Sequence, residues 1–277
     1  MKGALPILLL LLGGGGILLS FLRARSRAVF AQDGFSTLGR PATAGELLRR
    51  VAAMLLLAGV LLLTVAIPFA LGMAGTEPEA RDLSYVSLFG VHATLALFLV
   101  CYYLLSGHRS VAGFLCLRSG RPLADLTAGI FIGAAGWLLT ILLAALFVGL
   151  WYLLAGAPPG GEAAPASHVA PMIVWLVARP AAVKIAIICS AMFIEEFFFR
   201  SFLQTRVGPL AATLMFTAAH GAYGQPIVLI GILVISTVLS AAFMLYRNVL
   251  PCIVAHGVFD AIQMFVVIPL VLRALPV

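Results

Sequence analysis

The feature that most constrains this chain is a series of apolar stretches, most of which are about 20 residues long. A helix of that length and composition crosses the hydrocarbon core of a bilayer. Apolar residues make up 63% of the chain and charged residues only 10%, whereas a soluble domain is roughly half apolar. The sequence therefore predicts an all-α fold, a polytopic transmembrane helical bundle. The eight predicted spans are residues 4–22, 51–73, 86–105, 126–154, 180–203, 208–221, 226–246 and 249–272.

Three features interrupt this pattern. Segment 172–177 lies at the membrane interface or begins the fifth span, with a break at Pro180, because proline interrupts a helix. Loop 155–171 is rich in Pro, Gly and Ala and is predicted to be flexible. The sixth span ends after only about 14 residues, at GAYGQP (221–226). A helix too short to cross leaves room for water at membrane depth.

The arginines indicate how the chain is oriented. Basic residues gather in the loops on the cytoplasmic side of membrane proteins. Loop 23–50 holds six arginines and is placed inside, while the acidic loop 74–85 is placed outside and loop 106–125 inside again. The first span is predicted to be an uncleaved anchor with the N-terminus outside, and a cleaved signal peptide is the alternative. These features predict an integral protein of a bacterial inner membrane.

The net charge of +7 is explained by this loop bias, and we expect the lipid bilayer and no nucleic acid as a partner. The four cysteines are Cys101, Cys116, Cys189 and Cys252. They show no CxxC spacing, and three fall in or near apolar spans. We therefore predict buried free thiols in preference to disulfides or metal ligands.

Ionisable side chains at bilayer depth are the strongest functional signal, because each costs about 2.5–3.5 kcal/mol to insert. The residues concerned are His92, Lys184, Glu195, Glu196, Arg200, His220, His256 and Asp260. Lys184 lies near the outer end of its span and can extend its ammonium group to the interface. His92 has no ionisable neighbour on its own span and is predicted to be a structural histidine. The others belong to one group.

The residues of this group lie at similar depths in the membrane. Their depths can be estimated from the ends of the spans, because each helical residue rises 1.5 Å. Glu195 precedes the inner end of its span by 11 residues, or about 16 Å. His220 follows the inner end of its span by 12 residues, or about 18 Å, and His256 and Asp260 follow theirs by 8 and 12 residues, or about 12 and 18 Å. Three spans therefore place ionisable groups in one layer near the middle of the membrane.

Helical angles separate the two adjacent glutamates. Glu196 and Arg200 are four residues apart in the favourable order for a helical ion pair. Glu195 points about 100° away and is the carboxylate left free for chemistry. The alternative is that the whole EExxxR pattern is a charge clamp between helices. His256 and Asp260 also share a helix face, and an aspartate beside a histidine can fix its orientation.

Three short motifs resemble those of a known family. EEFFFR (195–200), FTAAH (216–220) and HGVFD (256–260) are similar to the EExxxR, FxxxH and HxxxN/D motifs of the CPBP family. These proteins are the CAAX-protease and bacteriocin-processing intramembrane proteases, also called the Abi family. The motif order and spacing match, and the resemblance covers roughly residues 180–265.

The resemblance implies a role for each matching residue. Glu195 and His220 would activate the attacking water. His256 and Asp260 would stabilise the oxyanion of the tetrahedral intermediate. The supporting residues would be Glu196, Arg200 and Phe216.

The chain departs from the family pattern at two positions. Ser201 stands where a glycine often follows the motif arginine, and the third motif ends in Asp260 where the family also uses asparagine. A protonated Asp260 can donate a hydrogen bond to an oxyanion, whereas an ionised one cannot. Apolar burial favours the neutral form of a carboxyl group. Asp260 is therefore predicted to be a donor, with orientation of His256 as the alternative.

A metal is the other open question. Glu195, His220 and His256 would make a plausible zinc site with an open fourth position. No HExxH motif is present, and the resemblance favours water activation without a metal. We therefore expect no cofactor, with zinc as the alternative.

These observations predict an intramembrane endopeptidase that cleaves near the terminus of a membrane-associated protein or peptide. A prenylated C-terminus, a leader peptide and a C-terminal anchor are all within the family's range. The alternatives are a transporter or proton relay, since buried Glu–His chains also occur there, and a catalytically silent scaffold. Residues 1–125 are predicted to form N-terminal transmembrane helices with cytoplasmic loops, and residues 126–277 the catalytic helical core.

Overall fold

The computed structural model describes residues 43–74, 84–155, 171–223 and 225–274, and every regular element within these ranges is a helix. Five helices there are long and apolar enough to cross a membrane: Ala44–Met73, Tyr85–Ser106, Pro122–Leu154, Ile227–Tyr246 and Leu250–Arg273. The pair Pro171–Val177 and Ala181–Val207 provides a sixth candidate span, bent by 118°. The prediction of an all-α, polytopic membrane protein is confirmed.

The predicted spans can be compared with these helices one by one. Five of them correspond to the five long helices, although the first of these helices begins at Ala44, within the predicted loop 23–50. The predicted span 180–203 corresponds to Ala181–Val207, preceded by the break expected at Pro180. The predicted span 208–221 is only an 11-residue helix, Pro209–Ala219. It covers about 16 Å, which is too short to cross a bilayer. The predicted span 4–22 and most of loop 155–171 lie outside the described residues.

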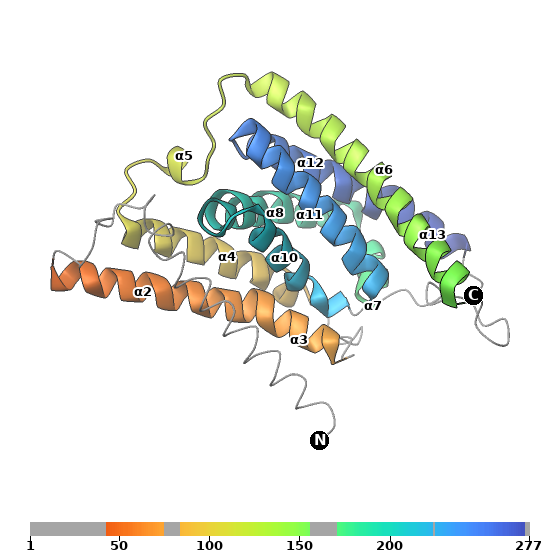
Figure 1. Cartoon of the computed structure of the whole chain (residues 1–277), viewed down its shortest axis with the longest axis horizontal. Coiled ribbons are helices and arrows are strands. Elements are labelled where there is room, and N and C mark those ends of the chain that lie inside the picture. Colours follow the sequence, from red (N-terminus) through yellow and green to blue (C-terminus); the bar gives the residue numbers. More distant parts are fainter. Residues whose placement is uncertain (1–42, 75–83, 156–170, 224, 275–277) are drawn as a thin grey trace.

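The N-terminal helices form an antiparallel pair (Figure 1). Helix α2 (Ala44–Leu61) continues through a π-helical turn, η1 (Leu62–Ala66), into α3 (Ile67–Met73), and α4 (Tyr85–Ser106) packs beside α2. The Thr43 hydroxyl caps α2 by accepting from the Glu46 N–H, and Ser84 and Ser87 form a capping box at the start of α4. Such caps satisfy the amide groups that begin a helix and so fix where it starts.

The remaining helices build the centre of the molecule and one flank. In chain order they are α5 (Val111–Phe114), α6 (Pro122–Ala155), α7 (Pro171–Val177), α8 (Ala181–Glu196), η4 (Phe197–Gln204), α9 (Thr205–Val207), α10 (Pro209–Ala219), η5 (Gly221–Tyr223), α11 (Pro226–Tyr246), α12 (Leu250–Ile262), η6 (Gln263–Val267) and α13 (Ile268–Ala274). Figure 1 shows α8, α10, α11 and α12 between the α2–α4 pair and α6. Helix α6 packs along α12 and α11, while α4 and α12 both contact α8. Helix α8 is therefore held from two sides.

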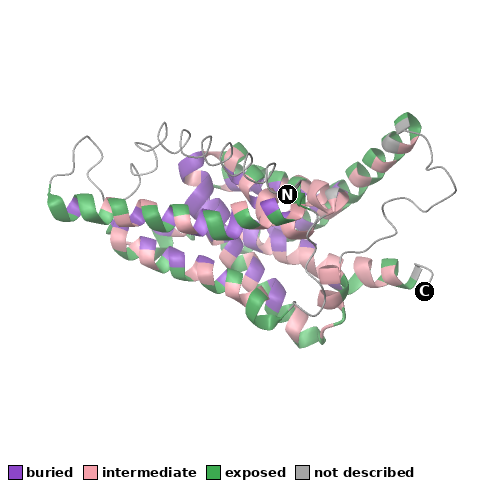
Figure 2. Ribbon diagram, turned by 90° about the horizontal axis from the view of Figure 1, so that it is seen from below, coloured by how far each residue is buried: buried purple, intermediate pink, exposed green. Residues whose placement is uncertain are grey.

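The burial pattern fits a bundle whose surroundings are lipid. Figure 2 shows buried residues concentrated where the central helices cross, and largely exposed residues along the outer helices. Leu153 of α6, Leu104 of α4 and Leu245 of α11 are large apolar side chains that are at least 70% exposed. A water-soluble protein rarely presents so much contiguous apolar surface.

An aromatic cluster fixes η4 against α4. Phe98 and Tyr102 of α4 meet Phe202 of η4 edge to face, with ring centroids 5.0 and 4.6 Å apart. The guanidinium of Arg206 stacks over the Phe202 ring at 4.1 Å. Edge-to-face pairs and cation–π contacts add to the apolar burial of these rings. The helical segment that follows the two glutamates is thus anchored to the N-terminal pair.

Two glycines bring α3 close to η5, the turn that follows α10. A Cβ atom at Gly72 would lie 1.8 Å from the carbonyl oxygen of Gly221, and one at Gly221 would lie 2.5 Å from the Phe69 Cα. Only glycine permits the two backbones to approach this closely. The contact holds the end of α10, and with it His220, against the N-terminal helices.

All four cysteines are free thiols, as the sequence predicts. Cys252 is buried, and Cys101 and Cys116 are half-buried. The expectation of burial is wrong for Cys189, which is exposed on α8. An apolar environment for this thiol would be provided by lipid, because the position faces away from the packed helices.

Candidate active site

Glu195 lies one residue before the end of α8, where the helix passes into the π-helical segment η4. Its side chain is buried and lines a cavity of about 300 Å³ enclosed by the α3, α4, α7, α8 and α10 regions. The polar side chains of His92, His220 and Tyr223 line the same cavity. π-Helical turns are frequent at functional sites, where they change the direction in which side chains project. Glu195 therefore faces an internal space and not the lipid.

His220 is the side chain that faces one oxygen of Glu195. The His220 Nε2 lies 3.8 Å from Glu195 Oε2. That oxygen is buried and has no hydrogen-bond partner among the described residues. Native proteins rarely leave a buried polar atom unpaired, and those that remain often belong to catalytic sites.

The tautomer of His220 follows from its other nitrogen. Nδ1 lies 2.8 Å from the carbonyl oxygen of Phe216, one of the last carbonyls of α10, which have no partner within the helix. A carbonyl can only accept, so Nδ1 carries the proton and donates. In the neutral imidazole, Nε2 is then an acceptor. Two acceptors, Nε2 and Oε2, thus face each other across 3.8 Å.

The predicted pair between Glu196 and Arg200 is present. Arg200 Nε donates to Glu196 Oε2 at 3.2 Å, and both side chains are completely buried. Arg200 also donates to the Ser236 hydroxyl of α11 at 3.0 Å. A buried ion pair needs such additional bonds to offset the loss of hydration.

Glu196 also contacts His256, which the helical pattern did not show. Glu196 Oε1 lies 2.9 Å from His256 Nδ1. On the other side of the ring, His256 Nε2 lies 3.4 Å from Asp260 Oδ2, and the Asp260 side chain is 27% exposed. His256 is therefore held between two carboxyl groups, those of Glu196 and Asp260.

Phe216 lies in the middle of these groups. Its ring is 4.7 Å from the His220 ring and 5.9 Å from the His256 ring, centroid to centroid. The Arg200 guanidinium lies 5.1 Å from its centroid. Phe216 therefore packs against both histidines and against Arg200 of the ion pair. These contacts link the seven predicted site residues, which lie on α8, η4, α10 and α12, with His220 directly after the last residue of α10.

The sequence interpretation missed His92. It is not isolated, because its Nε2 lies 3.2 Å from Glu195 Oε1 and its Nδ1 lies 2.8 Å from the Ser190 hydroxyl oxygen. The signal that could have found it is depth. Counted from the inner end of α4 at Ser106, His92 lies 14 residues or about 21 Å deep, which is within one helical turn of His220.

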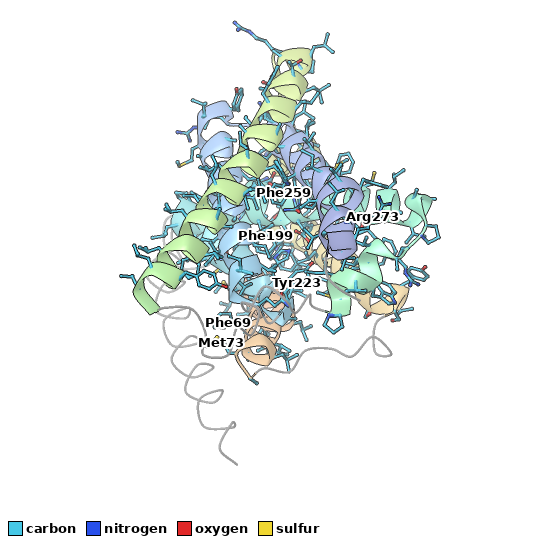
Figure 3. The ribbon with its side chains drawn as sticks, turned by 90° about the vertical axis from the view of Figure 1, so that its right-hand side faces the viewer. Phe69, Met73, Phe199, Tyr223, Phe259 and Arg273 are labelled. Carbon is cyan, nitrogen blue, oxygen red and sulfur yellow. The ribbon has the colours of Figure 1, made fainter. Side chains whose placement is uncertain are left out.

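The sequence interpretation also missed Tyr223. Its ring is parallel to that of His220, with 6.0 Å between the centroids. Tyr223 and Phe199 of η4 line the same cavity, and Figure 3 labels both side chains together with Phe69 of α3. Nothing in the sequence pattern marks this tyrosine, because it lies in the turn after α10 and its position depends on the packing of α3.

A metal at this site would need a suitable set of ligands. Among the described residues, no group of three or more His, Cys, Asp or Glu side chains is arranged to hold a metal ion. In the set suggested by the sequence, both nitrogens of His256 face carboxylates. That histidine would have to break one of these contacts to bind zinc with Glu195 and His220.

The fold and the site together define the class of this protein: it is a polytopic helical membrane protein with a buried Glu–His site. The family comparison specifies it further, since residues 177–262 match the model described as type II CAAX prenyl endopeptidase, Rce1-like. The match includes all three motifs. This part of the chain is therefore similar to the Rce1-like CAAX endopeptidases, a family of hydrolases. A search of the curated proteins found no match, and neither did a search of the solved structures.

Proposed function

We propose that this protein is an intramembrane endopeptidase that hydrolyses a peptide bond near the terminus of a membrane-associated substrate. The substrate is a prenylated C-terminus, a leader peptide or a C-terminal anchor. The observation that supports this proposal best is the buried, unpaired Oε2 of Glu195, which faces His220 Nε2 in a cavity. The experiment that tests it is replacement of Glu195, which is argued in the Discussion.

The proposed mechanism begins with one water molecule between two acceptors. The water donates one hydrogen to Glu195 Oε2 and the other to His220 Nε2. As its oxygen attacks the substrate carbonyl carbon, one proton moves to Glu195 and the carbonyl π-electrons move onto oxygen. General base catalysis of this kind contributes about 10²–10⁴ in rate.

The second step breaks the peptide bond. The tetrahedral intermediate re-forms its carbonyl, the C–N bond breaks, and the proton held by Glu195 passes to the leaving nitrogen. His256 and Asp260 stabilise the oxyanion between the two steps. Donors placed where charge develops are often the largest single contribution to such reactions. Glu196 holds His256 in position by accepting a hydrogen bond from its Nδ1–H, and Arg200 in turn holds Glu196.

Asp260 acts as a donor in this mechanism, and Asp260→Asn tests that role. Asparagine keeps a donor at the same position, so we expect Asp260→Asn to retain activity within about tenfold, whereas Asp260→Ala loses more. An ionised Asp260 that orients His256 would give a different result, because the activity of the asparagine variant would then fall by orders of magnitude. Cleavage rates of both variants on one substrate decide between the two roles. Near-normal activity in the alanine variant would remove Asp260 from the site.

Water activation in this proposal needs no metal. We expect purified protein to keep its cleavage activity after prolonged treatment with a strong chelator. Measuring bound metal by elemental analysis alongside the cleavage rate provides the control. Loss of stoichiometric zinc together with activity, and recovery of both when zinc is added, would contradict the proposal. Glu195, His220 and His256 would then be assigned as ligands of a Lewis acid that acidifies its water.

We propose an orientation in a bacterial inner membrane from the distribution of the basic residues. Seven basic residues lie near the start of α2, between α4 and α6, or at the ends of α9 and α11: Arg49, Arg50, Arg109, Arg118, Arg121, Arg206 and Arg247. Near the opposite helix ends lie Arg179, Lys184 and Arg273. Because basic residues accumulate on the cytoplasmic side, we place the first group of helix ends inside. The predicted N-terminus outside depends on the span 4–22.

The cavity that contains Glu195 reaches the opposite end, since it is lined by Ser84 at the start of α4 and by Met172 of α7. In a cysteine-free variant, Met172→Cys should therefore react with a membrane-impermeant thiol reagent in intact bacterial cells. The matched position Arg109→Cys should react only after the cells are permeabilised. The reverse pattern would overturn the orientation.

A further inference from the structure

His92 contacts the proposed base but takes no part in the steps above. It lies on α4, outside the residues 177–262 that match the family model. Its side chain is buried between Ser190 and Glu195, two residues of α8. A buried imidazole with both nitrogens bonded to one neighbouring helix is held in a fixed orientation.

The two oxygens of Glu195 have different partners. Oε1 lies 3.2 Å from His92 Nε2, which is within hydrogen-bond range, while Oε2 lies 3.8 Å from His220 Nε2 and has no hydrogen-bond partner among the described residues. A carboxylate bonded through one oxygen cannot rotate freely about its terminal torsion. The bond to His92 therefore determines which oxygen faces His220.

Ser190 fixes the ring of His92. Its hydroxyl oxygen lies 2.8 Å from His92 Nδ1 and 2.9 Å from the carbonyl oxygen of Ile187. The Glu195 carboxylate can only accept, so His92 Nε2 carries the proton that it donates to Oε1. In the neutral ring Nδ1 is then an acceptor, and the Ser190 hydroxyl donates to it.

We infer that His92 is a positioning residue for the proposed reaction: its Nε2–H binds Glu195 Oε1 and so directs Oε2 toward His220 and the attacking water. The inference rests on the proposed function of Glu195 as the base. It assigns to α4 a part in the site that the motifs do not include. The same type of contact, in which a second group orients the catalytic one, is common in proton-transfer sites.

Three substitutions on α4 test the inference, with cleavage of a membrane-anchored reporter substrate as the assay. His92→Phe removes the donor, and we expect kcat to fall at least tenfold with KM unchanged, because Glu195 loses its orientation and the substrate contacts remain. His92→Gln places an amide N–H near the position of Nε2 and should restore kcat to within about threefold of the wild type. Thr94→Val is the matched control, since Thr94 is half-buried two residues away and donates to the Gly90 carbonyl of its own helix. It should not change kcat.

A spectroscopic measurement makes the test independent of activity. In protein labelled with ¹⁵N-histidine, the signal absent from His92→Gln identifies His92. We expect that signal to show a proton on Nε2 and to shift in Glu195→Gln. An unprotonated Nε2, or equal kcat for His92→Phe and the wild type, would overturn the inference. If the wild-type protein cleaves nothing, the proposed function fails, and the spectrum still decides whether His92 binds Glu195.

Discussion

Glu195→Gln is expected to abolish cleavage while leaving the protein folded. The amide is nearly the same size as the carboxylate but cannot take a proton from water, so the rate should fall by about 10²–10⁴ or more. The fold should persist because Oε2 has no hydrogen-bond partner to lose within the described part of the chain, and the amide can still bond to His92. Cleavage of one reporter substrate and thermal unfolding in the same detergent measure the two effects separately.

Glu46→Gln is the matched control for this substitution. Glu46 is also a buried glutamate, but it lies on α2 and pairs with Arg50 at 2.6 Å, near the end of the bundle that does not contain the cavity. We expect the Glu46→Gln variant to cleave the reporter substrate at nearly the wild-type rate. Full activity in Glu195→Gln would remove Glu195 from the mechanism, and an unfolded Glu195→Gln would show that its role is structural.

Glu196→Gln should act in the opposite sense, mainly on stability. Glu196 and Arg200 are both completely buried, so loss of one charge leaves the other unpaired in a low-dielectric interior. Breaking a buried pair in this way costs about 3–5 kcal/mol. The free energy of unfolding in detergent, measured beside that of Glu195→Gln, tests the prediction.

The structure adds a second consequence for Glu196→Gln. Glu196 also accepts a hydrogen bond from His256 Nδ1 at 2.9 Å. The glutamine side chain has only one oxygen, so it cannot accept from Arg200 and His256 through separate oxygens as the carboxylate does. The fraction that folds should therefore also lose some activity, by misplacing His256. A matched double variant, Glu196→Leu with Arg200→Leu, should recover most of the stability, since apolar replacement of a buried pair is often neutral, and should stay inactive. A stable Glu196→Gln beside an unfolded Glu195→Gln would reverse the two roles.

The sequence by itself determined the membrane class and most of the helices. Spans of apolar residues follow directly from the thickness of the bilayer, so the long helices could be recognised from composition alone. The Glu196–Arg200 pair and the His256–Asp260 contact were also predictable. Each joins residues four apart on one helix, where the geometry is local and periodic. Counting depth then placed Glu195 and His220 at the same level.

Only the tertiary structure decided which of these groups meet across helices. His92 binds Glu195, and Glu196 binds His256. No regular spacing in the sequence predicts these contacts, because they depend on how α4, α8 and α12 are rotated and cross. Tyr223 reaches the site only because Gly72 and Gly221 let α3 approach η5. Depth along each helix is fixed by a constant rise per residue, but the direction in which a side chain faces its neighbours is fixed by packing.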